Sequence, residues 1–499
     1  MQRKVEEQSG RTTVSFIPMH LILYYLICCL LALGLTNCQS NTAPPPNDPA
    51  PDLRVAPPPH TTWQKIYDEL AQEIKQETAR AWAAYERYAW PHDNLEPLSK
   101  SYRDWYAEPI FISPIDGYST LKLMGLNEQA DRIEGYVADS VRFDRDIDVK
   151  VFEVNIRVLG GLLAMYAETN NPAVLAKARD FGDRMLPAFD SPTGMPYYYV
   201  NLKTGRPSGA VVNVAEAGSY LMELGLLSYF TKDPKYYQTG KRATLALNNR
   251  RSAIGLFGRD INVETGEWTE TNSMVGAYAD SYFEYLYKAY TLFGDPELKA
   301  IWDENIAAIQ RYLPDERDSL LWYPRVDMET GEVTQTEITL WDAYFPALLT
   351  LSGDLDRAER AFNSWEYVLD HYGMTPMVYN YAADTVVNGY HQLNPEVIES
   401  AYYLYSATGD EAYREFARDY YERLKACCRT EVAFTHLADV RTGEQDDEMA
   451  TFFVAETLKY FYLLFGGGDG VGLDSHVFTT EAHPFAKAGV VGAGAVLGF

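Results

Sequence analysis

The stretch ATGDEAYREFARDYYERL at residues 407–424 decides the fold class. It opens with a short polar break that contains Gly409, a residue type that ends helices because it tolerates a left-handed backbone. Behind the break, apolar residues recur at three- and four-residue steps, as in Tyr413, Phe416 and Ala417. This spacing predicts an amphipathic helix with one buried face.

Breaks of the same kind recur between other apolar-periodic segments. They are GLNEQA (125–130), ETNNPA (168–173), TKDPKYY (231–237), FGDPELK (293–299) and LSGDLDRA (351–358). Such repetition predicts stacked helical hairpins, and about seven of them would close into an α/α toroid. Turn-rich pieces at 190–205 and 260–268 predict short β-hairpins on one rim.

Composition excludes several classes of function. The 499 residues carry a formal net charge of −27, which argues against a nucleic-acid partner and against adsorption to anionic lipid. The sequence has no HExxH, no clustered His and Cys, no phosphate-binding glycine loop and no GxSxG. The sequence therefore lacks the motifs on which metalloprotease, nucleotide-dependent and serine-hydrolase chemistry depend.

The N-terminus is expected to be a targeting segment. The apolar run LILYYLICCLLALGL (21–35) is too short for a comfortable membrane span but suits a signal-peptide core. Cys38 follows it at the position where a bacterial lipoprotein signal is cut and lipidated, although Asn37 is larger than the residue usual there. An ordinary signal peptide or a signal anchor stays open as an alternative. A Pro-rich spacer follows at 38–62.

Carboxylates inside apolar, aromatic segments are the main chemical signal. They are Glu153, Glu216, Asp280, Glu284, Glu396, Glu399 and Glu456, joined by Glu481 in VFTTEAHP (477–484). Ionised acids in such surroundings need a compensating partner, such as a cation or a network of sugar hydroxyls. Paired carboxylates among aromatic residues are typical of glycoside hydrolysis, in which one acid protonates the leaving oxygen and another activates water.

Each of these residues also has a structural interpretation. Glu153 and Arg157 are spaced as a helix-surface ion pair, and Asp280 could be a capped or solvated position. Glu396 and Glu399 follow Pro395, where acids complement a helix N-terminus. Phe452 would by default belong to the core. The residues alone leave both interpretations open.

A series of motifs resembles glycoside hydrolase family 47, the class I α-mannosidases. The motifs are HDNLEPLS (92–99), FDRDIDVKVFEVNIRVLGGLLAMY (143–166), PTGMPYYYVNL (192–202), AEAGSYLMEL (215–224), GAYADSYFEYL (276–286), NPEVIES (394–400), FFVAETLKYFYLLF (452–465) and VFTTEAHP (477–484). The resemblance covers residues 63–485 and implies an (α/α)7 barrel with the C-terminal segment as a plug. The stretch at 338–362 resembles the ER degradation-enhancing α-mannosidase-like branch.

The resemblance also implies roles for individual residues. Glu153 is expected to be the general acid, acting through a water, Glu396 the general base, and Asp280 a further catalytic carboxylate. The residues expected to bind substrate are Arg157, Glu216, Glu399, Phe452, Glu456 and Glu481. Thr480 is expected to bind Ca²⁺, and its oxygen-only surroundings suit this hard cation better than zinc.

The sequence departs from the family pattern at five positions. They are Asn94, Ser119, Met377, Asn394 and Ala450. The central carboxylates are retained, so catalysis is expected, while the leaving-group subsite and the linkage preference are not fixed by the resemblance.

The sequence therefore predicts a fold dominated by α-helices and a calcium-dependent, inverting exo-α-mannosidase. Its expected substrates are α-1,2-linked mannose residues of oligosaccharides or glycoprotein glycans. Its expected parts are a signal peptide (1–37), a linker (38–62), a catalytic domain (63–485) and a tail (486–499), with export to the bacterial envelope and membrane contact only through the N-terminal anchor. The rivals are a lectin-like mannose-binding protein without turnover, and another α/α-toroid glycosidase or lyase.

Overall fold

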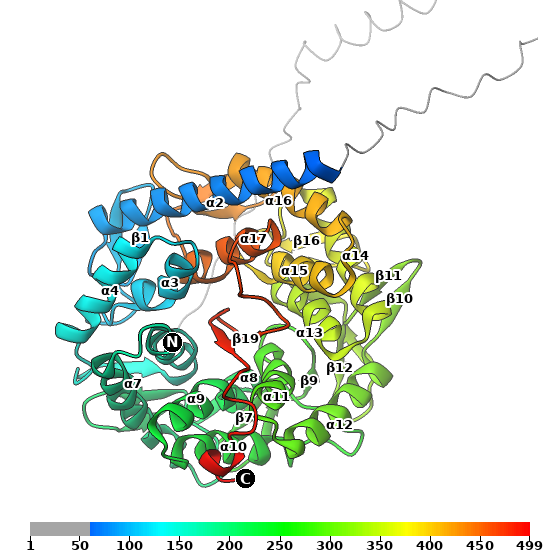
Figure 1. Cartoon of the computed structure of the whole chain (residues 1–499). Coiled ribbons are helices and arrows are strands. Elements are labelled where there is room, and N and C mark those ends of the chain that lie inside the picture. The colour runs from blue at the N-terminus through cyan, green and yellow to red at the C-terminus, as the bar shows by residue number, and fades with distance from the viewer. Residues whose placement is uncertain (1–59) are drawn as a thin grey trace, which may run out of the picture. The chain divides into compact units, whose positions relative to one another are not determined.

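The computed structural model describes residues 60–499, which form two concentric rings of helices (Figure 1). The inner ring consists of α3 (Ile112–Leu123), α6 (Gly160–Thr169), α9 (Leu221–Thr231), α11 (Asp280–Phe293), α13 (Phe345–Ser352), α15 (Glu396–Thr408) and α17 (Leu458–Leu464). The outer ring consists of α4 (Asn127–Asp139), α7 (Pro172–Met185), α10 (Lys235–Asn248), α12 (Pro296–Tyr312), α14 (Leu355–Tyr372), α16 (Ala412–Cys428) and α2 (His60–Tyr88). Seven inner and seven outer helices confirm the predicted (α/α)7 barrel.

Hydrophobic pattern separates the two rings. The inner helix α9 reads LMELGLLSYFT and is apolar around most of its circumference, so it is buried between neighbours. The outer helix α16 carries its buried residues on one face only, as predicted. The ring closes where α17 packs against α2, so the first described helix lies beside the last helix of the barrel.

Helix ends follow from the predicted breaks. Gly294, Gly353 and Gly409 end inner helices with positive φ, a backbone region that favours glycine. Asn171 and Asp295 then cap the next outer helices by accepting a bond from a backbone N–H, each just before a proline at the first helical position. These breaks turn the chain back by about one helix diameter, so each outer helix runs antiparallel to its inner partner.

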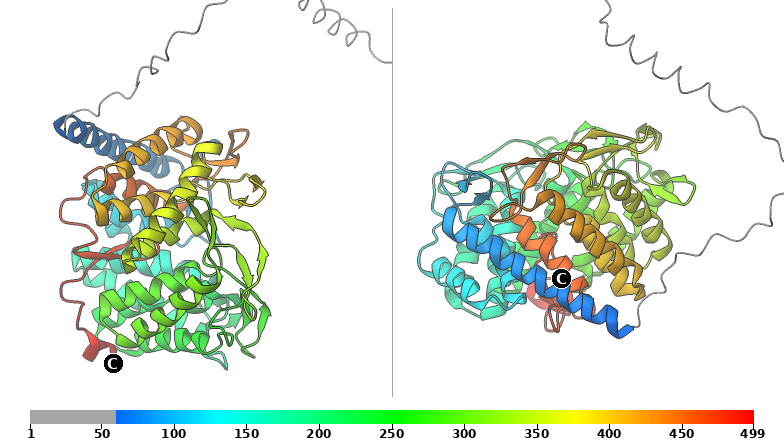
Figure 2. Two further views of the ribbon diagram at one scale, coloured as in Figure 1. Left: turned by 90° about the vertical axis from the view of Figure 1, so that its right-hand side faces the viewer. Right: turned by 90° about the horizontal axis from the view of Figure 1, so that it is seen from above.

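Short antiparallel sheets lie at one end of the barrel (Figure 2). Their strands are β1 (Asn94–Glu96) and β2 (Ser101–Arg103); β3 (Asp148–Lys150), β4 (Tyr199–Asn201) and β5 (Pro207–Ser208); β6 (Val211–Asn213), β7 (Asp260–Asn262) and β8 (Trp268–Glu270); β9 (Asn272–Ser273), β12 (Arg325–Asp327) and β13 (Val333–Gln335); β10 (Asp315–Arg317) and β11 (Leu320–Trp322); β14 (Glu337–Thr339), β15 (Val378–Asn380) and β16 (Thr385–Asn388); β17 (His436–Asp439) and β18 (Glu444–Asp446). Strands directly precede several inner-ring segments, as β3 does, so the sheets mark the end at which inner helices begin.

The C-terminal segment enters the ring as a hairpin. Strands β19 (His476–Phe478) and β20 (Pro484–Ala486) pair antiparallel, and β19 lies in the centre of the ring (Figure 1). The hairpin contacts the inner helices α6 and α11. The following tail ends in α18 (Gly494–Leu497), which packs on α9 and α10 with Leu497 buried.

The predicted signal peptide and most of the predicted linker lie outside the described residues. Within residues 60–499, none of the helices combines the length and apolarity needed to cross a membrane.

Candidate active site

A cavity of about 270 Å³ lies inside the ring, where the inner helices begin. Its lining includes every residue that the sequence predicted for the site. These are Glu153, Arg157, Glu216, Asp280, Glu396, Glu399, Phe452, Glu456, Thr480 and Glu481. The cavity thus brings together side chains that are up to 328 residues apart in the sequence (153 to 481).

Helix direction explains this convergence. All inner helices run the same way, so their N-termini meet at one end of the barrel. The carboxylates lie in first turns of inner-ring helices: Glu153 in α5 (Val151–Val154), Glu216 in α8 (Val214–Gly218), Asp280 in α11, Glu396 and Glu399 in α15, and Glu456 in η4 (Phe453–Thr457). The positive ends of helix dipoles favour acids there. Glu396 and Glu399 therefore lie at a helix N-terminus, as predicted, and they also line the cavity.

Two segments of π-helix shape the cavity. Arg157 lies in η1 (Asn155–Leu159), and Glu456 lies in η4. A π-helical turn inserts an extra residue into the hydrogen-bonding pattern, which rotates the side chains that follow, and such turns are frequent at functional sites. In both inner segments this rotation occurs where a charged residue faces the cavity.

Arg157 is the hub of the charged network. Its Nε donates to Glu153 Oε2 (3.1 Å), and its Nη1 donates to Glu481 Oε2 (2.6 Å) and lies 3.7 Å from Asp116 Oδ2. Its guanidinium also lies over the Phe452 ring, 5.6 Å from the centroid. The ion pair between Glu153 and Arg157 therefore forms as the spacing predicted, but inside the cavity rather than on a helix surface.

Burial raises the pKa values of the cavity acids. It raises the pKa of Asp280, Glu216 and Glu399 to about 7 and that of Glu396 to about 8. Burial also raises the pKa of both Glu456 and Glu481 well above the usual range, and the charges of neighbouring acids add to the shift. Carboxyl groups with pKa values near neutrality are suited to proton transfer at physiological pH.

Glu396 has one carboxylate oxygen free for chemistry. Asn394 Nδ2 donates to its Oε1 at 3.3 Å, while Oε2 is buried and has no hydrogen-bond partner among the described residues. A buried, unpaired oxygen is costly unless another group fills the site. Water or a sugar hydroxyl in the cavity is the natural partner.

Glu399 belongs to a second ion-pair network. Lys288 Nζ lies 3.7 Å from Glu399 Oε1 and also pairs with Glu284, and Tyr460 donates to Glu399 at 3.1 Å. Burial of Lys288 would lower the pKa of its ammonium, but these acids hold that pKa above its ordinary value. The predicted substrate-binding acid Glu399 is thus fixed in place by a cation that the sequence reasoning did not select.

Thr480 presents two oxygen atoms without protein partners. Its N–H donates to Tyr285 Oη at 3.4 Å, while neither its hydroxyl nor its carbonyl oxygen takes part in a hydrogen bond within residues 60–499. No group of three or more His, Cys, Asp or Glu side chains in this part of the chain has the arrangement of a metal site. The oxygen atoms present therefore fit a hard cation that would be held by the two threonine oxygens and by waters. The surrounding carboxylates would accept hydrogen bonds from those waters.

Several residues that line the cavity were not predicted from the sequence. They are the aromatic residues Phe152, Tyr278, Trp341 and Tyr344, and Asn213, which caps α8. Lys288, which pairs with two of the lining acids, was not predicted either. Tyr278 combines 43% exposure with φ of 82°, a conformation that is strained for an aromatic residue. Phe152 and Tyr278 lie one and two residues before the acids Glu153 and Asp280, inside motifs of the sequence, but an aromatic residue there resembles core by composition alone.

Most of the departures from the family pattern do not line the cavity. Asn94 contacts Trp105 and Glu448, Ser119 contacts Lys459, and Ala450 donates its N–H to His436. Met377 is joined through its backbone to Leu340 and Tyr390. Among the five positions only Asn394 lines the cavity. The set of central carboxylates is therefore complete.

The amino-acid sequence matches the profile of Glycosyl hydrolase family 47 over residues 77–487. The chain belongs to this family. It is 36% identical over 439 residues to the Alpha-mannosidase I MNS4 of Arabidopsis thaliana, covering 83% of this chain and 69% of that protein. It is 35% identical over 499 residues to the human ER degradation-enhancing alpha-mannosidase-like protein 2, covering 93% and 82%.

A solved structure supports the same assignment. The alpha-1,2-mannosidase from Trichoderma reesei matches this family 47 barrel with a TM-score of 0.77 at 28% identity, covering 84% of this chain and 99% of that chain. The protein is a glycoside hydrolase of the class I α-mannosidase type. The predicted family and fold are confirmed, while the roles of individual site residues stay predictions.

Proposed function

We propose that this family 47 protein is a calcium-dependent, inverting exo-α-mannosidase acting on terminal α-1,2-linked mannose of oligosaccharides or glycoproteins. One observation carries the proposal. The unpaired oxygen of Glu396, the Glu153–Arg157 pair and the free oxygens of Thr480 line a single cavity. The names of its relatives support mannose as the sugar.

The carboxylates divide the proton transfers between them. Glu396 accepts a proton from the water that attacks the anomeric carbon, and Glu153 supplies a proton, through a water, to the departing oxygen. Because water attacks directly, the product anomer is inverted. Arg157 keeps its charge, since the surrounding acids raise its pKa, and it holds Glu153 beside the leaving group. Asp280 is the further catalytic carboxylate.

The hairpin supports cleavage from the chain end. Strands β19 and β20 occupy the centre of the ring, and their connecting turn places Thr480 and Glu481 in the cavity wall. A polysaccharide cannot thread past this wall. The cavity therefore accommodates a terminal sugar, with the rest of the glycan at the open end.

Calcium completes the site in this proposal. Thr480 would hold the ion by its hydroxyl and carbonyl oxygens, and the ion would supply a hard electrophilic contact for sugar hydroxyls. Burial raises the pKa values of Glu456 and Glu481, and a divalent cation nearby would offset the cost of ionising these acids.

Turnover of α-1,2-mannobiose tests the proposal. We expect release of mannose in calcium-containing buffer, followed by chromatography of the products. Binding of the disaccharide without release would favour the lectin-like alternative. Release that persists unchanged in EDTA would favour a different α/α-toroid glycosidase.

We also propose that the protein is exported and held on the bacterial envelope by a lipid on Cys38. The apolar run at 21–35 and the cysteine that follows it support this proposal. Replacing Cys38 by Ala is expected to abolish acylation and move the protein from the membrane fraction to the soluble fraction, because one thiol is the attachment point. Metabolic labelling with a fatty acid measures this. An unchanged label or membrane fraction would show that the apolar run is the anchor.

A further inference from the structure

Lys459 is a buried cation whose hydrogen-bond acceptors are neutral. It lies in α17, three residues after Glu456, and is 0% exposed. Its Nζ donates to Ala482 O at 2.5 Å and to Ser119 Oγ at 3.0 Å. Within residues 60–499 it forms no ion pair at 4.0 Å or closer.

Ala482 lies in the turn that carries the calcium-site residue. This turn connects β19 to β20 and is closed by bonds from Thr479 N–H to His483 O (3.0 Å) and from Ala482 N–H to Thr479 O (3.0 Å). Ala482 has φ of 53°, a left-handed conformation that costs free energy for a residue other than glycine. An external bond to its carbonyl oxygen therefore helps to keep the turn in this conformation.

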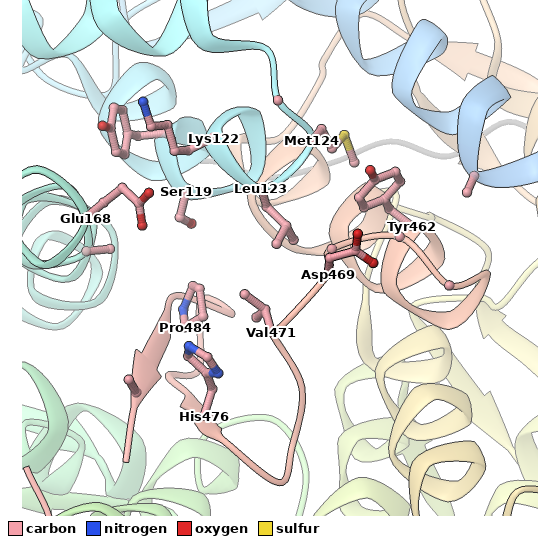
Figure 3. A pocket seen from close by; sticks show the side chains of 18 of the residues that line it. Ser119, Lys122, Leu123, Met124, Glu168, Tyr462, Asp469, Val471, His476 and Pro484 are labelled. Atoms are coloured by element: carbon pink, nitrogen blue, oxygen red, sulfur yellow. The ribbon is translucent and has the colours of Figure 1, made fainter. Parts of the chain in front are cut away.

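The turn is a wall between two cavities. Thr480 and Glu481 line the catalytic cavity. Pro484 and Ser119 line a second cavity of about 700 Å³, at the ends of α3 and α6. Figure 3 shows Ser119 projecting from α3 toward the hairpin, with Pro484 and His476 on the opposite side. Thr479, Ala482 and His483 in this turn are fully buried, and the bond from Lys459 to Ala482 O is one of the contacts that hold the turn.

Keeping a lysine at this place is costly. Burial lowers the pKa of Lys459 to about 7, although Glu456, Asp116 and Glu481 oppose the shift. An apolar residue of similar volume would avoid the desolvation cost, and such replacements are often neutral or stabilising. The fold alone therefore gives no reason for an ammonium group at this position.

We infer that Lys459 is a positioning residue that holds the Thr480–Glu481 turn in the geometry required for calcium and sugar binding, with Ser119 as its second anchor. This inference rests on the proposed function. The ammonium fixes the carbonyl oxygen two residues after Thr480, so it orients both oxygens that Thr480 presents to the cavity. Residues that orient metal ligands in this way are commonly needed for full metal affinity.

Three substitutions test the inference. Lys459→Met keeps the volume and removes the donor, Lys459→Gln keeps a shorter neutral donor, and Lys122→Met is the matched control. Lys122 lines the second cavity from α3 but contacts Asp131 rather than the turn. We expect Lys459→Met to weaken calcium binding about 10–100-fold and Lys459→Gln less. Lys122→Met should behave as the parent protein.

Calorimetric titration with calcium alone, and kcat and KM at saturating calcium, are the measurements. A structural role would lower the melting temperature of the calcium-free variant, whereas a positioning role weakens calcium binding and raises KM at an unchanged calcium-free melting temperature. Parental calcium Kd and KM in a folded Lys459→Met variant would overturn the inference. If that variant does not fold, Lys459→Gln decides: a weakened Kd supports the inference and a parental Kd overturns it. A parent protein that binds no calcium would refute the proposed function instead.

Discussion

Glu396→Gln is expected to lower kcat by roughly 10²–10⁴ while the fold persists. Glutamine keeps the size of the side chain and the contact with Asn394, but it cannot accept the proton of the attacking water. The loss should fall on kcat with little change in KM, because the step affected is chemical rather than binding. Steady-state kinetics on α-1,2-mannobiose measure both constants.

Glu153→Gln should lose a similar factor of roughly 10²–10⁴ for the complementary reason, since an amide cannot donate the proton to the leaving oxygen. Glu415→Gln is the matched control. Glu415 also lies in a first helical turn, but in the outer helix α16, where it is exposed. Near-parental turnover in Glu396→Gln or Glu153→Gln would remove that residue from the mechanism.

The stereochemistry of the product gives an independent check of these two roles. NMR spectra recorded early in the reaction should show the inverted anomer of mannose, because water rather than an enzyme carboxylate attacks the sugar. A retained anomer would require a covalent intermediate and would refute the assignment of Glu396 as a general base.

Chelation with EDTA is expected to abolish activity, and added Ca²⁺ should restore it. Zn²⁺ should not replace Ca²⁺, because the surroundings of Thr480 offer oxygen but none of the nitrogen or sulfur ligands that zinc favours. Activity assays with each metal after exhaustive dialysis measure this.

Thr480→Val links this requirement to one residue. Valine keeps the shape of the side chain and removes the hydroxyl, so calcium binding should weaken about 10-fold or more. Calcium should also raise the melting temperature of the parent more than that of the variant, since a ligand selective for the folded state stabilises it by mass action. The control Thr385→Val changes an exposed threonine in β16. Full activity in excess EDTA, with no calcium in the purified protein, would exclude the site.

Much of the architecture could be predicted because its signals are local. Helix breaks with Gly409 or Gly353 and amphipathic runs such as α16 are written in consecutive residues. The acids were also recognisable as candidates for the site, because an ionised carboxylate among apolar and aromatic residues needs a compensating partner. The structural interpretation of these acids and their place in the site turned out to be compatible. Glu396 begins a helix and Glu153 pairs with Arg157, and both residues also line the cavity.

Other features of the site left no trace in the local sequence. The π-helical turns at Arg157 and Glu456 come from packing within the ring, because the same residues could continue an ordinary helix. Lys288 was not selected from the sequence, yet it lies buried between Glu284 and Glu399 from two different helices.

Local sequence was enough to predict the helical repeat, the family motifs and the acids, since periodicity and residue type act over a few turns of chain. Tertiary structure alone decided which of these residues meet. Parallel inner helices bring their N-termini to one end, and there burial raises the pKa of Glu396 to about 8. Lys459 shows the same distinction: its partner Ala482 lies 23 residues further along, and only the closed ring brings the hairpin back to it.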